Sequence, residues 1–224
     1  GVHLARSTQG DWIAATADLL DPLVLLMKRR VLLSKKIHTD DVPVPVLDPE
    51  RQHTREARLW VYLGDDANPY VVFDYSPTHA EKYTVEFLKD FLGHLQCDAY
   101  TAYDKVRAIV VGCWAHARRY FFDAQKVEPA RAAIALGCIG QIYKVEELAK
   151  NKSAQERLAL RQEHSKKAIE ELRNWMDREQ FSVLPESALD TFERDGAAPV
   201  PQAAPETIEQ AAEVLRLAAA ERWK

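Results

Sequence analysis

Residues 35–47 read KKIHTDDVPVPVL, and residues 94–100 read HLQCDAY; the fold is decided by these two stretches. Side chains alternate between the two faces of a strand, so the first stretch predicts Asp40 on one face and Asp41 on the other. Asp98 ends the second apolar run. A carboxylate inside a strand is costly unless positive charge balances it. We therefore expect two strands side by side that hold Asp40 and Asp98 over a metal ion.

The residues between and after these stretches predict an α/β sheet. Alternating or apolar runs indicate further strands, a helix begins near Thr78, and the chain turns helical again from Ala115. The order strand, strand, strand, helix, strand, strand, helix is typical of a mixed sheet whose first portion is antiparallel. Pro43 and Pro45 predict that the first strand ends or reaches a sheet edge there. The expected strands after the first are Ala57–Gly64, Pro69–Tyr75, Leu95–Ala99 and Arg107–Trp114.

Helical patterns flank this core. Apolar residues recur at helical spacing over residues 11–30, where Pro22 is expected to kink or restart the helix. Two pairs have capping-box spacing, Thr78 with Glu81 and Ser153 with Glu156. The whole pattern predicts five segments: an N-terminal helical segment 1–34, a core 35–128, an all-helical insertion 129–179, a linker 180–205 and a C-terminal helix 206–224.

Composition excludes several classes of protein. The chain has 224 residues, 47% of them hydrophobic, which is enough to bury a full core. No apolar run is long enough to span a membrane, and nothing at the start resembles a signal peptide. Three widely spread cysteines argue for a reducing compartment, so we expect a cytoplasmic protein. The net charge is −4, but residues 177–213 carry nine acidic and two basic residues. The rest of the chain is near neutral and can still present a basic face to nucleic acid.

The two aspartates suit divalent-metal chemistry. Asp40 and Asp98 are 58 positions apart, which leaves room for a hairpin and a helix to return the chain beside the first strand. Hard cations such as Mg²⁺ and Mn²⁺ take oxygen ligands, and carboxylates on neighbouring strands hold them for phosphoryl transfer. Aspartates also simply end strands, so this spacing leaves a structural role open.

Basic side chains and a Cys-x-x-His unit suggest further contacts. Lys35 and Lys36 belong to a basic cluster that either caps a helix end or contacts phosphate. Arg118 and Arg119 offer the bidentate fork that suits phosphate. The zinc alternative pairs Cys113 and His116 with His94 and Cys97. Positions 94 and 97 of a strand face opposite ways, which opposes that alternative.

Three motifs carry a resemblance to a known family. They are HTDDVPV at 38–44, LQCDAYTAY at 95–103 and CWAHARRYF at 113–121, in this order along the chain. Together they resemble the transposase of the insertion-sequence sixty-six family. Residues 1–12 resemble the segment before that family's catalytic core, and the helical stretch to about Leu189 resembles its insertion, with ERLALRQ at 156–162.

The resemblance implies a ribonuclease-H-like core of the Asp-Asp-Glu type. Asp40 would be the first metal ligand and Asp98 the second, with Mg or Mn as cofactor. Asp41 stands beside the first ligand but faces the other way, so it is not counted as a ligand. His116 and Cys113 would lie at a strand-to-helix junction near the metals or the DNA.

The implied activity is DNA transposition. A DNA strand would be hydrolysed at the element end, and the freed 3′-hydroxyl would attack target DNA, with Lys35, Lys36, Arg118 and Arg119 holding phosphates. Implied partners are the transposon ends and target DNA, further copies of the chain on DNA, and small accessory transposition proteins; a membrane is not expected.

The chain departs from the family pattern beyond Leu189. The family's third carboxylate follows an Asn-Asn pair, which this sequence lacks, and Glu221 in Ala-Ala-Glu-Arg is the nearest candidate. We therefore expect a truncated or altered C-terminus and impaired cleavage. The alternatives are a non-catalytic DNA-binding remnant, a ribonuclease-H-like nuclease on another substrate, and a zinc-stabilised interaction module.

Overall fold

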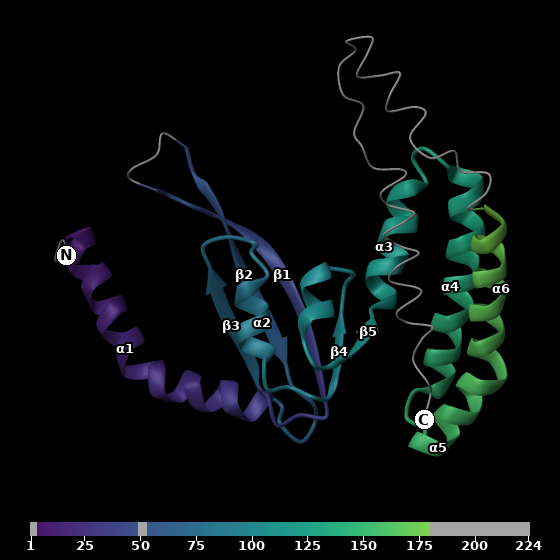
Figure 1. The fold of residues 1–224 in the computed structure, drawn as a ribbon, viewed down its shortest axis with the longest axis horizontal. Coiled ribbons are helices and arrows are strands. Elements are labelled where there is room, and N and C mark those ends of the chain that lie inside the picture. Colours follow the sequence, from purple (N-terminus) through teal and green to yellow (C-terminus); the bar gives the residue numbers. More distant parts are fainter. Residues whose placement is uncertain (1–3, 49–52, 180–224) are drawn as a thin grey trace, which may run out of the picture. The chain divides into compact units, whose positions relative to one another are not determined.

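The computed structural model describes residues 4–48 and 53–179. The chain forms two compact units, Gly1–Val110 and Val111–Lys224 (Figure 1). The predicted linker 180–205, the predicted helix 206–224 and Glu221 lie outside the described residues.

A five-stranded sheet with the order β3-β2-β1-β4-β5 forms the body of the first unit. β1 pairs with β2 and β2 with β3 in antiparallel fashion, whereas β1 pairs with β4 in parallel. The mixed α/β class predicted from the element order, with its antiparallel portion first, is therefore confirmed. The strands are β1 (Lys36–Val46), β2 (Arg55–Leu63), β3 (Val71–Ser76), β4 (His94–Cys97) and β5 (Ile109–Gly112).

The two prolines of β1 do not end the strand; they lie where one side of the strand is an edge of the sheet. β1 remains paired with β2 as far as Val46, so Pro43 and Pro45 lie inside the strand. On its other side, β1 pairs with β4 only from Lys36 to His38. The prolines thus stand where the strand has a ladder on one side, which is where a residue without an N–H is tolerated.

The first unit contains a long helix, α1 (Arg6–Val31), a short helix, α2 (Lys82–Leu88), and a 3₁₀ helix, η1 (Thr101–Lys105). α1 continues through Pro22 as one element, so of the two predicted effects of Pro22 the helix does not restart, and the ribbon bends part-way along it (Figure 1). The predicted capping box at Thr78 is also wrong. α2 begins after Glu81 without a side-chain cap, and the Thr78 hydroxyl instead accepts the Ala80 N–H within the preceding turn.

The core of the first unit lies on one face of the sheet. The end of α1 and the α2 side chains pack there against β1, β2 and β4, and the rings of Tyr62 and Phe87 stack with centroids 3.6 Å apart. Ile37 and Thr39 of β1 are buried on this face, while Val42 is exposed on the other. The alternation predicted for β1 is therefore confirmed.

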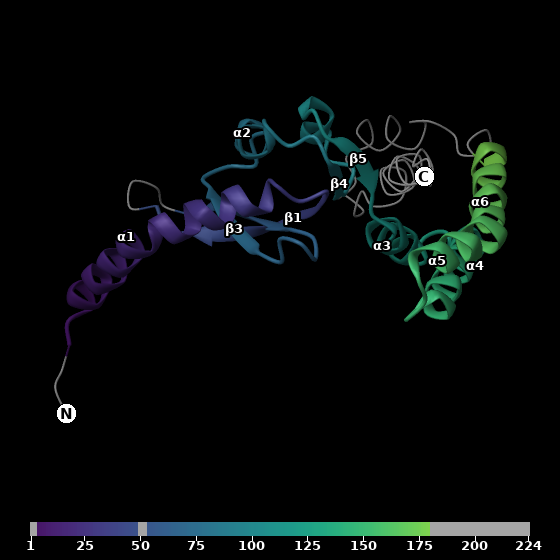
Figure 2. The same cartoon turned by 90° about the horizontal axis from the view of Figure 1, so that it is seen from below.

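The second unit is helical. It comprises α3 (Trp114–Ala124), α4 (Pro129–Ala149), α5 (Ala154–Leu160), a π-helical turn η2 (Arg161–Ser165) and α6 (Lys166–Glu179). α4 and α6 lie side by side (Figures 1 and 2), and Phe121 of α3 meets Trp175 of α6 edge to face. The capping box of Ser153 and Glu156 is present and starts α5, as predicted. Within residues 4–48 and 53–179, no helix combines the length and the apolar character that crossing a membrane requires.

Candidate functional site

Asp40 lies in β1, and Asp98 is the first residue after β4, the parallel neighbour of β1. The β1–β4 register pairs Lys36 with His94 and His38 with Gln96, an offset of 58 positions that also separates Asp40 from Asp98. The pairing itself ends at His38 and Gln96, two residues before each aspartate. Partners in register share a face of the sheet, and neighbouring strands are about 4.8 Å apart.

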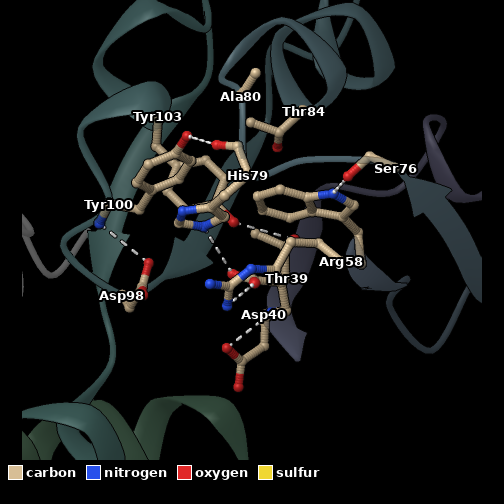
Figure 3. A network of polar contacts seen from close by, with 12 residues as sticks. Thr39, Asp40, Arg58, Ser76, His79, Ala80, Thr84, Asp98, Tyr100 and Tyr103 are labelled. Carbon is tan, nitrogen blue, oxygen red and sulfur yellow. Dashed lines mark hydrogen bonds and ion pairs between the residues drawn. The ribbon is translucent and has the colours of Figure 1, made fainter. Parts of the chain in front are cut away.

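Backbone N–H groups orient both carboxylates (Figure 3). Oδ1 of Asp40 accepts the N–H of Asp41 at 2.9 Å, and Oδ1 of Asp98 accepts the N–H of Tyr100 at 3.1 Å. The second contact is an Asx turn, which closes the chain directly after β4. Carboxylate oxygens are the ligand type that Mg²⁺ and Mn²⁺ prefer.

Asp41 has a different role from Asp40. Its side chain is only 10% exposed. Oδ2 of Asp41 accepts a hydrogen bond from Nη1 of Arg58 at 3.2 Å, and Oδ1 lies 3.4 Å from Nε2 of His79. The predicted alternation places it on the face opposite Asp40, and the contacts agree. Asp41 therefore ties β1 to β2 and to the turn before α2.

An aromatic stack continues from Asp41 towards Asp98. The rings of Trp60, His79 and Tyr100 all stack on one another, with centroid distances of 5.4 Å for Trp60–His79, 4.3 Å for His79–Tyr100 and 6.0 Å for Trp60–Tyr100; Figure 3 shows His79 and Tyr100 side by side. The Tyr100 hydroxyl donates to the carbonyl of His79 at 2.5 Å. Because the amide of Tyr100 holds Asp98, a chain of contacts runs from Asp41 to Asp98. Sequence reasoning missed His79, which follows a turn and belongs to no periodic pattern.

Two buried phenols lie behind the stack. The hydroxyl of Tyr103 is 3.5 Å from that of Thr39, and burial raises the pKa of Tyr103 well above its ordinary value. Burial likewise raises the pKa of Tyr62, whose hydroxyl donates to Thr84. Both phenols therefore stay protonated at neutral pH and take part in structural hydrogen bonds rather than acting as bases.

Cys113 and His116 form a pair at the N-terminus of α3, in the second unit. Cys113 is the residue before the first turn of α3. Burial alone would raise the pKa of this thiol, but hydrogen bonds from His116 and from the Ala115 amide outweigh burial and lower the pKa to about 7. A substantial fraction of Cys113 is thus thiolate at neutral pH.

The predicted zinc arrangement finds no support among the described residues. In residues 4–48 and 53–179, no three His, Cys, Asp or Glu side chains gather as a metal site. Structural zinc normally needs four ligands. Among these residues, Asp40 and Asp98 are therefore not joined by a third such side chain.

The predicted phosphate contacts are exposed basic side chains. Lys35 directly precedes β1 and Lys36 begins it, and Lys36 shares the face of Asp40 four residues away, roughly 13 Å along a strand. Arg118 and Arg119 are exposed on α3, where the guanidinium of Arg118 lies 5.8 Å from the ring centre of Phe122. The first pair therefore belongs to the unit of the carboxylates, and the second pair belongs to the helical unit.

Known proteins resemble this chain over most of its length. The uncharacterised protein y4hP of Sinorhizobium fredii is 28% identical over 206 residues, which are 80% of this chain and 37% of that protein. The uncharacterised protein y4qI of the same organism is 27% identical over 228 residues, 88% of this chain and 42% of that protein. The chain spans about two fifths of the length of these curated relatives. The model of the family described as "Transposase IS66 family" matches residues 1–198 of the 224, and the chain therefore belongs to that family.

Proposed function

We propose that this chain is the catalytic domain of a DNA transposase, with a ribonuclease-H-like core that uses Asp40 and Asp98 as ligands of Mg²⁺ or Mn²⁺. The observation that supports the proposal is the register of β1 and β4: Lys36–His38 pair with His94–Gln96 at an offset of 58 positions, the same offset that separates Asp40 from Asp98. Membership of a transposase family implies interaction with DNA. The strand order with three antiparallel strands followed by parallel β4 supports the ribonuclease-H-like assignment.

The bound cation would stabilise charge on the attacking and leaving oxygens of a phosphodiester. The protein's own part is to orient the ligands. The Asp41 and Tyr100 amides fix the two carboxylates, and the contacts from Asp41 through His79 hold Tyr100 in place. Lys36, on the face of Asp40, would contact a phosphate on the same strand of DNA. Further copies of the chain and accessory transposition proteins would complete the assembly on DNA.

We further propose that the isolated chain binds the cation weakly and cleaves DNA poorly. Two-metal phosphoryl transfer needs ligands that hold both ions, and the described residues offer no third carboxylate beside Asp40 and Asp98. A misplacement of about 1 Å can cost on the order of a hundredfold in rate. This same observation favours a second candidate function, a non-catalytic DNA-binding remnant of a transposase.

Metal binding tests the ligand assignment. Electron paramagnetic resonance of Mn²⁺ titrated with wild type, Asp98→Asn and Asp40→Asn should show that each substitution removes the bound ion without unfolding the chain. Asp66→Asn is the matched control, because Asp66 is an exposed aspartate of the β2–β3 turn in the same unit. Equal Mn²⁺ binding by wild type and Asp98→Asn contradicts the proposal.

DNA cleavage in Mn²⁺ separates the two candidate functions. Slow cleavage that Asp98→Asn abolishes supports an impaired transposase, whereas DNA binding without cleavage supports the remnant. Rapid wild-type cleavage that is abolished by Glu221→Gln would identify Glu221 as the third ligand and contradict the proposed impairment.

A further inference from the structure

The Asp98 carboxylate lies beyond the strand pairing that fixes its neighbours. The pairing of β1 with β4 ends at His38 and Gln96, and Asp98 begins the loop between β4 and η1. A residue outside a ladder lacks the backbone hydrogen bonds that hold a strand in place, so other contacts must fix it. A metal ligand has to stay within about 0.5 Å of its productive position. The contacts of this loop therefore determine how well Asp98 can hold a cation.

Tyr100 connects this loop to a different part of the first unit. Its N–H donates to Oδ1 of Asp98 at 3.1 Å, and its hydroxyl donates to the carbonyl of His79 at 2.5 Å. Its ring stacks on the ring of His79, with centroids 4.3 Å apart and planes 21° from parallel (Figure 3). One residue thus holds Asp98 through its backbone and is itself held by His79 through its side chain.

His79 belongs to the β3–α2 connector, residues 77–81, which is itself anchored in the core. Nε1 of Trp60 donates to Oγ of Ser76 at 2.7 Å, and the Ser76 hydroxyl donates to the carbonyl of Thr78 at 2.8 Å. Trp60 and Ser76 are both fully buried. The Trp60 ring also stacks on that of His79, with centroids 5.4 Å apart. The connector is therefore fixed to β2 and to the end of β3, and it can restrain the loop that it contacts.

The charged groups around His79 do not account for the link between the connector and the loop. Arg58 and Nε2 of His79 both lie beside the Asp41 carboxylate, at 3.2 Å and 3.4 Å, so this carboxylate keeps a cationic partner without the imidazole. Glu81 of the connector and Lys105 of η1 form an ion pair at 2.6 Å. Both of these side chains are more than half exposed, and exposed ion pairs contribute little. The ring stack and the tyrosine hydroxyl are therefore the main links.

We propose that His79 is a positioning residue, which sets the placement of the Asp98 carboxylate through Tyr100 and thereby its affinity for a divalent cation. The cation rests on the function proposed above, whereas the link from the connector to Asp98 does not. His79 contacts neither the substrate nor the cation in this role. It acts by restraining a loop, because a loop that is already held in its binding conformation loses less entropy when the cation binds.

Titration of Mn²⁺ into the full 224-residue chain, followed by electron paramagnetic resonance, tests the role of the His79 ring. His79→Ala removes the stack and should weaken Mn²⁺ binding by about twofold to tenfold, the factor that a stacked aromatic pair contributes. His79→Phe keeps a ring against Tyr100 and should regain most of the wild-type affinity. Tyr100→Phe keeps the ring and the N–H but loses the hydroxyl bond, and it should also weaken binding by about twofold to tenfold. His53→Ala is the matched control, because His53 is an exposed histidine of the same unit that precedes β2.

Amide hydrogen exchange of Tyr100 tests the link without any cation. His79→Ala and Tyr100→Phe should each speed the exchange of the Tyr100 N–H by a similar factor, because its acceptor, Asp98, then lies on a less restrained loop. Exchange at the paired amides of β1 and β2 should stay at wild-type rates. Circular dichroism shows whether each variant keeps its fold.

Three results overturn the proposal. The first is wild-type Mn²⁺ affinity in His79→Ala although Asp98→Asn loses the ion. The second is a Tyr100 exchange rate that His79→Ala leaves unchanged, or that rises together with the rates of β1 and β2 and so indicates a general loss of stability. The third is a His79→Phe variant as weak as His79→Ala, because the stack would then not be the link. Wild-type Mn²⁺ affinity in Asp98→Asn would instead overturn the ligand assignment, and the Tyr100 exchange would still decide whether the connector holds the loop.

Discussion

Replacing Gly93 with alanine tests the packing that brings β4 beside β1. A Cβ at this position would lie 2.5 Å from the carbonyl oxygen of Lys35 and 2.7 Å from Cζ of Phe91. The Lys35 carbonyl is fixed by the His94 N–H, which it accepts at 2.9 Å, and Phe91 is buried in the core. Neither neighbour can move freely, so the new methyl group forces the start of β4 away from β1.

The size of the effect follows from these distances. Ordinary contacts of a Cβ begin at 3.4 Å, so the backbone or the ring must shift by about 1 Å. Overpacking of this kind costs about 1–3 kcal/mol. Alanine also lowers the conformational entropy of the unfolded chain, which offsets about 0.4–1 kcal/mol of this destabilisation. We expect the first unit to lose about 1–2 kcal/mol, and Mn²⁺ binding to weaken because Asp98 follows β4.

Amide hydrogen exchange is the suitable assay, because it reports the two units separately. Protection should fall for the amides of β4 and its neighbour β1. Gly137→Ala is the matched control, because nothing lies within 4 Å of the new Cβ in α4. Replacing a helical glycine with alanine stabilises a helix by up to about 1 kcal/mol. Protection in β4 that is unchanged or increased by Gly93→Ala would refute the packing argument.

Three further predictions follow from single residues. Burial raises the pKa of Asp74 despite nearby Lys28, so the folded protein favours the protonated carboxyl. The stability that Asp74 contributes is therefore present at low pH and is lost as the pH rises through its pKa in the folded state. Asp74→Asn should therefore raise the urea midpoint at pH 7, with a gain that shrinks near pH 4. Cys113, with its pKa lowered to about 7, should react with iodoacetamide at pH 7 faster than Cys138, whose pKa burial raises, as measured by peptide mass spectrometry. Ser153→Ala removes the cap of α5 and should cost about 1 kcal/mol, seen as faster amide exchange in its first turn.

Local patterns predicted those features that depend on near neighbours in the chain. The alternation of residues 36–42 gave Asp40 and Asp41 opposite faces, because the side-chain period of a strand is a property of its backbone. The capping box at Ser153 formed because both partners lie within one turn. The same spacing at Thr78 failed, because Ser76 and the turn before α2 engage that segment in other contacts.

The sequence by itself determined the α/β class, the family motifs and the pair of aspartates 58 positions apart. Only the tertiary structure decided that Pro43 and Pro45 lie inside β1, because their tolerance depends on how far β4 extends along it. It also decided that His79 joins Asp41 to Tyr100. These features rest on contacts between residues distant in the chain, and no local spacing encodes which distant groups will meet when the strands pair.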